Sequence, residues 1–315
     1  MNAAYDLMVA GRPSVDVMFS GLHEWPQLGN DIESDGFGWC AGTSFNTPAA
    51  ANRIGLRVAF VATVGNDAWS RMIRDEFEAE GLPTDFLQVE NRPLPGVSVA
   101  LNFAGDRGFV THWGGDDTYD DRVDARALEV VERIDARHLH AYVDEAPALV
   151  AAARRRGMTI SLDAWGGPWW TSPRPLAGQV AGTDVLLANE AEASAMTGET
   201  EPARVLERLA EHCGCVVIKR GVAGAVGKAG GDVCAVPADP VELVDATGAG
   251  DAFNAGFLAG WLGGLGLEAS LTLGVICGSR AAGDYGGYRG CPREPEFREI
   301  AAARGIALPT TGGAS

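Results

Sequence analysis

The chain has 315 residues, of which 46% are hydrophobic and 21% charged, as is typical of a globular protein with a large buried core. Its 25 basic and 42 acidic residues give a formal net charge of -17 at pH 7. Such a field repels phosphate backbones and anionic lipid, so we expect neither nucleic acid nor a membrane surface as a partner. The first residues, MNAAYDLMVAG, lack the basic segment of a secretory signal, and the longest apolar stretch, 252–267, is interrupted by Asn254. We therefore expect a cytoplasmic enzyme.

Short apolar runs alternate with helical patterns along most of the chain. The runs end in polar residues or glycine and read YDLMVAG, VAFVATVG, TISLDAW, DVLLANE and CVVIKRG. Helical patterns occur between them, at 70–80, 146–156 and 202–213. The alternation predicts a three-layer α/β/α fold with a doubly wound, mostly parallel sheet, whose strands point their carboxyl ends at a site.

Two regions interrupt this alternation. Residues 14–39 and 96–113 contain strand-like segments with period-two patterns, such as VSVALNF and GFVTHW, and no long helix separates these two. They predict a small antiparallel sheet inserted into the α/β core, which we expect to act as a lid and to pair through its exposed edges in a homodimer. We expect residues 1–310 to form a single domain and residues 311–315 to be a disordered tail.

The glycine-rich string at 245–257, DATGAGDAFNAGF, is the strongest indication of a chemical function in the sequence. Gly248 and Gly250 permit a tight turn, so the amides of Gly248, Ala249 and Gly250 point at one spot. That spot is also the start of a helical pattern, where free N–H groups and the helix dipole favour an anion. Asp251 lies in the first helical turn and faces the same place. A carboxylate beside an anion hole suits a base that holds a hydroxyl about to attack phosphate; the alternative is an ordinary helix cap.

This string resembles the C-terminal signature of the ribokinase-like (PfkB) family of carbohydrate and nucleoside kinases, D-T-x-G-A-G-D-x-F, from which only Ala246 departs. Residues 41–48, AGTSFNTP, resemble the N-terminal signature G-G-x-x-x-N-x-A, with Ala41 and Pro48 as the departures. The two signatures occur in the right order, and the resemblance spans nearly the whole chain. It implies a ribokinase-like fold and ATP-dependent, Mg²⁺-assisted phosphorylation of a hydroxyl, expected to be primary, on a small sugar or sugar-like molecule.

The resemblance assigns roles to residues in and near both signatures. Asp251 matches the family's catalytic base, and Gly248 to Gly250 match its anion hole. Asp16, Gly42 and Asn46 match residues that bind substrate hydroxyls, as Asp251 also does. Carboxylates and amides are suited to a polyol because they make several hydrogen bonds at once. The alternatives are a strand-end turn for Asp16 and a plain helix cap for Asn46.

Other strand ends match the nucleotide and magnesium positions of the family. Asn189 and Glu192 form N-x-x-E after the strand-like run DVLLA, and the resemblance places Mg²⁺ near Glu192 through water. The alternative is a helix N-cap with an acidic first turn. Val275 takes the place of an asparagine that borders the adenine in many relatives. Altogether, the resemblance implies the following nucleotide contacts: Asn189, Lys219, Arg220, Gly221, Gly224, Gly250 and Val275. For Lys219 a solvated basic turn is the alternative.

A monovalent cation site is also implied. Asp245 and Thr247, with carbonyls of the loop at 284–291, match positions that hold K⁺ in many relatives. The string GDYGGYRG in this loop is rich enough in glycine to wrap carbonyl groups around an ion.

The implied chemistry is in-line transfer of the γ-phosphoryl group of ATP, with Asp251 accepting the proton of the attacking hydroxyl. At a positive helix end Asp251 should be a weak base, which a loose transition state tolerates. A nucleoside kinase of the same family is the nearest alternative, favoured if Trp113, Trp165, Trp169 and Trp170 line the acceptor pocket. A catalytically inactive nucleotide-binding relative is a further alternative. A nicotinamide dehydrogenase is disfavoured because no G-x-G-x-x-G follows the first strand.

Overall fold

A computed structural model of the protein describes residues 3–103, 106–116, 118–143, 147–164, 180 and 182–309. The predicted tail at 311–315 and the tryptophans Trp165, Trp169 and Trp170 lie outside the described residues. None of the helices in the described part of the chain is long and apolar enough to cross a membrane.

The apolar runs predicted as strands form one large sheet. Its strands are β1 (Leu7–Ala10), β4 (Val58–Val64), β5 (Leu87–Val89), β8 (His138–Tyr142), β9 (Thr159–Asp163), β10 (Thr183–Asn189), β11 (Cys213–Lys219), β12 (Ala225–Ala229) and β13 (Asp232–Val236). They lie in the order β13-β12-β11-β10-β9-β8-β1-β4-β5. All neighbours from β5 to β11 pair in parallel, and β12 and β13 extend one edge antiparallel. The predicted mostly parallel sheet is confirmed.

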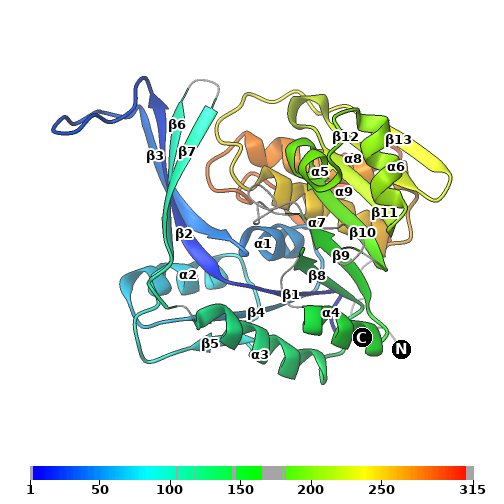
Figure 1. The fold of residues 1–315 in the computed structure, drawn as a ribbon, viewed down its shortest axis with the longest axis horizontal. Helices are drawn as coiled ribbons and strands as arrows, with labels where there is room; N and C mark the ends of the chain where they lie inside the picture. The colour runs from blue at the N-terminus through cyan, green and yellow to red at the C-terminus, as the bar shows by residue number, and fades with distance from the viewer. Residues whose placement is uncertain are drawn as a thin grey trace.

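Helices cover both faces of this sheet (Figure 1). One face carries α1 (Asn46–Arg53), α2 (Ala68–Ala79), α7 (Ala249–Leu262), α8 (Leu267–Ala282) and α9 (Glu294–Ala303), and the other carries α3 (Tyr119–Val131), α4 (Pro147–Arg155), α5 (Glu190–Thr197) and α6 (Pro202–Ala210). Successive strand residues serve opposite cores because a strand alternates its side chains: Leu187 packs in the first cluster, whereas Leu186 and Ala188 pack in the second. The three-layer α/β/α architecture is thereby confirmed.

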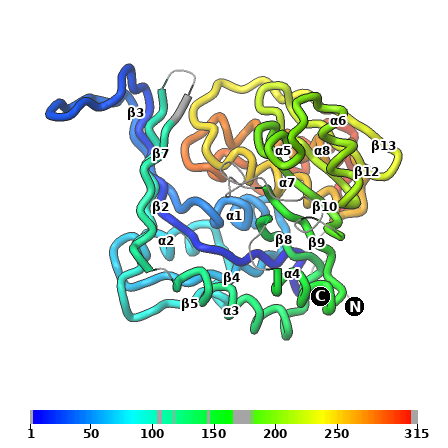
Figure 2. The backbone as a smooth tube through the Cα atoms, viewed as in Figure 1, coloured from blue at the N-terminus to red at the C-terminus, as the bar shows by residue number. Residues whose placement is uncertain are grey.

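A second, smaller sheet stands beside the first, as predicted (Figures 1 and 2). We call it the lid, and its action as a lid stays a prediction. Its strands are β2 (Pro13–Leu22), β3 (Gly36–Thr43), β6 (Val97–Phe103) and β7 (Asp106–His112), in the order β3-β2-β6-β7. The outer pairs are antiparallel as expected, while β2 and β6 pair in parallel. As the tube in Figure 2 shows, the chain leaves β1, runs out through the lid and returns into α1. The lid strands therefore end next to the carboxyl edge of the main sheet.

Candidate active site

Asp251 lies where the two signature strings meet. The helix α7 begins after Gly248, whose φ of 71° places it in the left-handed region open to glycine, and Asp251 falls in the first turn. Its Oδ2 accepts a hydrogen bond from Nδ2 of Asn46 at 3.1 Å, and its Oδ1 accepts one from Oγ1 of Thr47 at 3.3 Å. Phe45 is the N-cap of α1 and makes no side-chain cap bond, so Asn46 does not serve as the predicted alternative cap.

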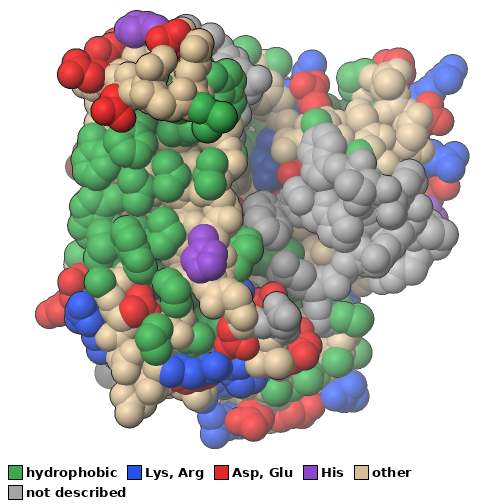
Figure 3. All heavy atoms as spheres, turned by 60° about the vertical axis from the view of Figure 1, so that its left-hand side comes forward, with side chains coloured by type: hydrophobic (Ala, Val, Ile, Leu, Met, Phe, Trp, Pro, Cys, Tyr) green, Lys and Arg blue, Asp and Glu red, His purple; other side chains and the backbone are tan. Residues whose placement is uncertain are grey.

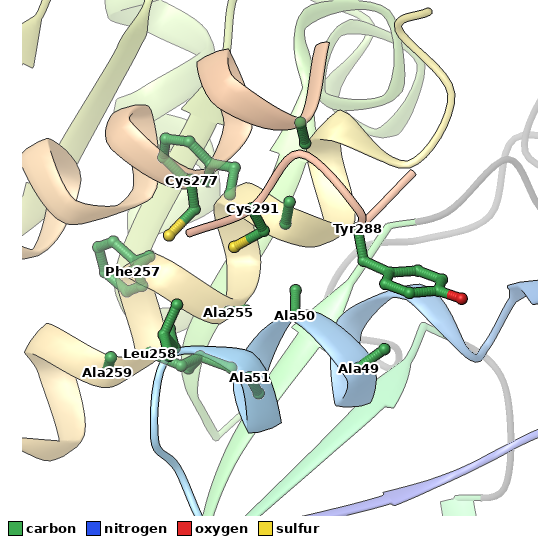
Figure 4. Packing of buried hydrophobic residues seen from close by; sticks show 14 of the residues in the cluster. Ala49, Ala50, Ala51, Ala255, Phe257, Leu258, Ala259, Cys277, Tyr288 and Cys291 are labelled. Atoms are coloured by element: carbon green, nitrogen blue, oxygen red, sulfur yellow. The ribbon is translucent and has the colours of Figure 1, made fainter. Parts of the chain in front are cut away.

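Small side chains allow α1 and α7 to approach closely beneath this site. Figure 4 shows Ala50 and Ala51 of α1 beside Ala255 and Leu258 of α7. All of them are buried in the same core cluster. Because an alanine methyl group keeps the helices near one another, the polar residues at the two helix starts come within hydrogen-bond distance. The packing of the core thus positions Asp251 against its partners on α1.

The environment of Asp251 makes it a stronger base than its helix position suggests. Burial, followed by the negative charge of Asp163, raises the pKa of its carboxyl group to a net value of about 7. The charge of Lys219 and the hydrogen bonds from α1 act in the opposite direction. The expectation of a weak base is therefore corrected: desolvation and a like charge outweigh the helix terminus.

The predicted substrate residues Asp16 and Gly42 are brought together by the lid. Asp16 lies within β2 and is paired with β3, so it is not a turn residue. Oγ of Ser14 donates to its Oδ1 at 2.8 Å, and the same hydroxyl lies 2.7 Å from Oγ1 of Thr43. Thr43 has a φ of 54°, an uncommon conformation for a β-branched residue, and its amide hydrogen bonds to the Asp16 carboxyl group. Burial raises the pKa of Asp16 to about 6.

Lys219 is enclosed rather than solvated. Its Nζ donates to Oδ2 of Asp163 at 3.0 Å and to Oδ1 of Asn254 at 3.2 Å, and Nδ2 of Asn254 donates to the same Asp163 oxygen. A Cβ atom placed on Gly250 would lie 3.4 Å from this Nζ, so the ammonium group lies against the glycine-rich turn. Asp163 and Asn254 were not among the predicted site residues. Asp163 ends a parallel strand, and Asn254 follows Asp251 by one helical turn.

The N-x-x-E string forms a capping box. Oδ1 of Asn189 accepts from the amide of Glu192 at 2.8 Å, and Oε2 of Glu192 accepts from the amide of Asn189 at 2.7 Å. The alternative of a helix N-cap is therefore realised, and the magnesium role of Glu192 stays a prediction. The charge of Glu192 still acts on Lys219 by raising its pKa, so both lie at one end of the site.

The remaining residues predicted to bind the nucleotide lie in two places, in the turn after β11 and in the buried core. Arg220 forms an ion pair with Glu190 at 2.9 Å, and a short 3₁₀ helix, Gly221–Ala223, is followed by Gly224 as its C-cap. Val275 exposes 3% of its surface and packs in the core, so its side chain offers no surface to an adenine. The turn after β11 therefore lies next to Lys219, whereas the Val275 side chain is buried in the core and does not reach this turn.

Asp245 and Thr247 present two buried oxygens that lack a hydrogen-bond partner. Oδ1 of Asp245 accepts from the amide of Thr247 at 3.0 Å, whereas Oδ2 of Asp245 and Oγ1 of Thr247 are buried and unpartnered. Such orphaned oxygens fit a cation with oxygen ligands. In the described part of the chain, no group of three or more His, Cys, Asp or Glu side chains forms a metal site.

Comparison with known proteins agrees with this geometry. Residues 40–294 match the pfkB family carbohydrate kinase. The chain is 27% identical to a ribokinase of Bacillus subtilis over 297 residues, which covers 94% of this chain and 99% of the relative. Its fold resembles the nucleoside kinase of Burkholderia thailandensis in complex with inosine, with a TM-score of 0.78, 18% identity and coverage of 96% and 100%. It also resembles a putative ribokinase II from E. coli in complex with ATP and Mg²⁺, with a TM-score of 0.75, 22% identity and coverage of 95% and 99%. The family match spans both signatures and the strand ends at Asp163, Asn189 and Lys219, and on this ground the chain belongs to the pfkB family of carbohydrate kinases, which act with ATP.

Proposed function

We propose that the enzyme transfers the γ-phosphoryl group of ATP to a primary hydroxyl of a small sugar or sugar-like molecule, with Asp251 as the general base. The observation that supports this most directly is the buried Asp251 carboxylate, held by Asn46 and Thr47 at the first turn of α7. A pKa of about 7 leaves much of this group ionised at neutral pH and able to accept a proton.

The acceptor binds between the lid and α1. Asp16 and Asn46 supply a carboxylate and an amide at this place, and Oδ1 of Asn46 is buried without a partner, free to accept from a substrate hydroxyl. Gly42 carries no side chain, which lets the carboxyl group of Asp16 lie against its backbone. The acceptor hydroxyl thus reaches Asp251 in a fixed orientation, and orientation supplies much of the rate of such a reaction.

The phosphate groups bind on the opposite side of Asp251. The amides of Gly248, Ala249 and Gly250 at this helix start take the charge that develops on the transferring group. The Ala249 amide also donates to the carbonyl of Ala246 at 3.3 Å, so it would be shared between that carbonyl and the phosphate. Lys219 lies against this turn and adds a positive charge. The turn at Gly221 to Gly224 and the Asn189 end of β10 complete the nucleotide side.

Two cations complete the proposal. Mg²⁺ near Glu192 neutralises phosphate charge when ATP is bound, and a single carboxylate is enough because Mg²⁺ keeps several waters. K⁺ is held by Asp245 and Thr247, whose unpartnered oxygens lie just before the glycine-rich turn. Holding this segment fixes the start of α7 and therefore the amides of the anion hole.

A nucleoside as acceptor is the second candidate, favoured by the similarity to a kinase crystallised with inosine. Trp113 lies at the base of the lid, where the guanidinium group of Arg12 lies 5.0 Å from its ring centroid. The stacking of Trp113 on a base therefore competes with its contact to Arg12.

The test is ADP release from ATP across pentoses, hexoses, sugar acids and nucleosides. We expect turnover with one class of acceptor and its loss in Asp251→Asn, while nucleotide binding measured by calorimetry persists. Turnover near that of the unmodified enzyme in Asp251→Asn would remove Asp251 as the base. Turnover with nucleosides alone would select the second candidate.

We also propose a homodimer that forms through the lid. Hydrophobic side chains gather on the lid side of the molecule (Figure 3), and Phe37 and Val110 expose 62% and 65% of their surface there. Val110→Asp should give a monomer in light scattering at micromolar concentration. Val233→Asp, which changes an exposed valine of β13 far along the main sheet, is the matched control and should leave the mass unchanged. A monomer in the unmodified protein contradicts the proposal.

A further inference from the structure

A buried polar cluster adjoins Asp251 without belonging to either signature role. It consists of Asp163 at the end of β9, Lys219 at the end of β11 and Asn254 in α7, and we call it the Asp163 cluster. The Asp163 and Lys219 side chains expose 5% and 13% of their surface, and Asn254 is fully buried. All three come from elements that end or begin at the carboxyl edge of the main sheet.

Hydrogen bonds connect the three members of the Asp163 cluster to one another. Lys219 donates to both other members, and Asn254 uses its oxygen to accept from Lys219 and its nitrogen to donate to Asp163. Removing a carboxylate and an ammonium group from water is costly, and packed apolar residues often stabilise a core as well or better. The surrounding cores are apolar, so the fold alone gives little reason for a charged cluster here.

The Asp163 cluster is aimed at the catalytic turn. The Lys219 ammonium group lies against the backbone of Gly250. Asn254 follows Asp251 by three residues in α7, which places both on one face of the helix. Asp163 and Lys219 both act electrostatically on Asp251, with opposite signs. The charges of both Asp163 and Asp251 thus act on Lys219, and its ammonium group is hydrogen-bonded to Asp163.

We propose that Asp163 and Asn254 are positioning residues, which hold the ammonium group of Lys219 beside the Gly248–Gly250 turn and keep it from pairing with Asp251. The inference rests on the proposed function of Asp251 as the base. Held on Asp163, Lys219 supplies a fixed positive charge where negative charge develops during transfer. Released from Asp163, it would turn to Asp251 and neutralise the base.

The other polar groups around Asp251 and Lys219 cannot take over the role of Asp163 in holding the ammonium group of Lys219. Asn46 and Thr47 of α1 contact Asp251 but carry no charge. The charge of Glu192 of α5 acts on Lys219 and, like that of Asp163, raises its pKa against the effect of burial. His140 of β8 faces Asp163 and Lys219, and burial lowers its pKa to about 4, so it is neutral at pH 7.

The test compares Asp163→Asn with Asp6→Asn. Asn keeps the shape of Asp163 but removes its charge, and we expect kcat to fall by about 10- to 100-fold while KM for the acceptor stays the same. The acid limb of the pH profile of kcat/KM should move to lower pH, because Asp251 loses a like charge and gains a cation. Asp6 is a similarly buried carboxylate, bound by Arg57 at the far end of β1. Asp6→Asn should lower the melting temperature and leave kcat and the pH profile unchanged.

A second variant guards against misfolding. Asn254→Ala leaves the Asp163–Lys219 pair in place but removes its bridge, and it should lower kcat less than Asp163→Asn does. If Asp163→Asn folds and keeps both the kcat and the acid limb of the pH profile of the unmodified enzyme, the inference is overturned. If Asp163→Asn does not fold, an unchanged kcat in Asn254→Ala overturns it instead. Loss of turnover in Asp251→Asn alongside a normal Asp163→Asn refutes only this inference. Turnover in Asp251→Asn refutes the proposed base itself.

Discussion

Gly42→Ala is expected to damage acceptor binding through a single added methyl group. The backbone of Gly42 lies directly against the carboxyl group of Asp16. A Cβ atom at Gly42 would come within 2.6 Å of both carboxyl oxygens and of the carboxyl carbon. Ordinary contacts of a Cβ atom begin near 3.4 Å, so even the most distant of these three atoms must retreat by about 0.8 Å.

The size of the effect follows from how Asp16 is held. Ser14 and the amide of Thr43 fix its carboxyl group, and the residue is buried, so the carboxyl group can move only by breaking these bonds. A misplacement of about 1 Å costs on the order of 100-fold in a positioned reaction. We therefore expect kcat/KM for the acceptor to fall by about 100-fold. Overpacking should also lower the stability by about 1–3 kcal/mol.

Steady-state kinetics with the acceptor varied at saturating ATP measure this effect, and calorimetry with a non-hydrolysable ATP analogue measures nucleotide binding. Gly38→Ala is the matched control on the same strand, because a Cβ atom there meets only Tyr285 and Met18 at 3.4 Å or more. Gly42→Ala should lose acceptor binding and keep nucleotide binding, and Gly38→Ala should keep both. A value of kcat/KM for Gly42→Ala within about threefold of that for Gly38→Ala, far from the loss expected of a misplaced group, refutes the reasoning.

Three further predictions concern charge. The pH profile of kcat/KM should lose activity as the pH falls through about 7, because Asp251 must be ionised to act as a base; a flat profile from pH 5 to 8 contradicts this. Since folding raises the pKa of Asp251, its contribution to stability is present below the unfolded value and is lost as the pH rises through about 7; Asp251→Asn should therefore raise the melting temperature more at pH 8 than at pH 4. Asp245→Asn should weaken activation by KCl, measured against choline chloride at equal ionic strength, and unchanged activation would remove Asp245 from the cation site.

The main sheet was predictable because its strands are buried on both faces. Runs such as DVLLANE carry apolar residues at successive positions, and the structure divides them between two cores on either side of the sheet. The lid was predictable only as strands. The patterns at 14–39 and 96–113 each predict antiparallel strands, but β2 and β6, which are distant in sequence, pair in parallel. No local pattern specifies which strand of one hairpin meets which strand of the other.

The two signatures assigned Asn46 and Asp251 separately to the substrate site, and the structure adds that Asn46 donates a hydrogen bond to Asp251. The N-x-x-E string shows the limit of such a motif. A capping box and a water-mediated magnesium site use the same Asn189 and Glu192 oxygens, so spacing cannot distinguish them. The structure shows the capping bonds, and these bonds do not test the magnesium role of Glu192.

Asp163 illustrates what strand-end reasoning can find when a motif does not mark the residue. The run TISLD ends in a carboxylate just as the neighbouring strands end in Asn189 and Lys219, and parallel strands present these ends to one edge. The rule that selected Asn189 and Lys219 therefore applies equally to Asp163. Neither signature string extends to β9, so the residue had no assigned role. Its partner Asn254 directly follows the C-terminal signature, which ends at Phe253, yet only the fold shows that its side chain turns to β9 rather than to solvent.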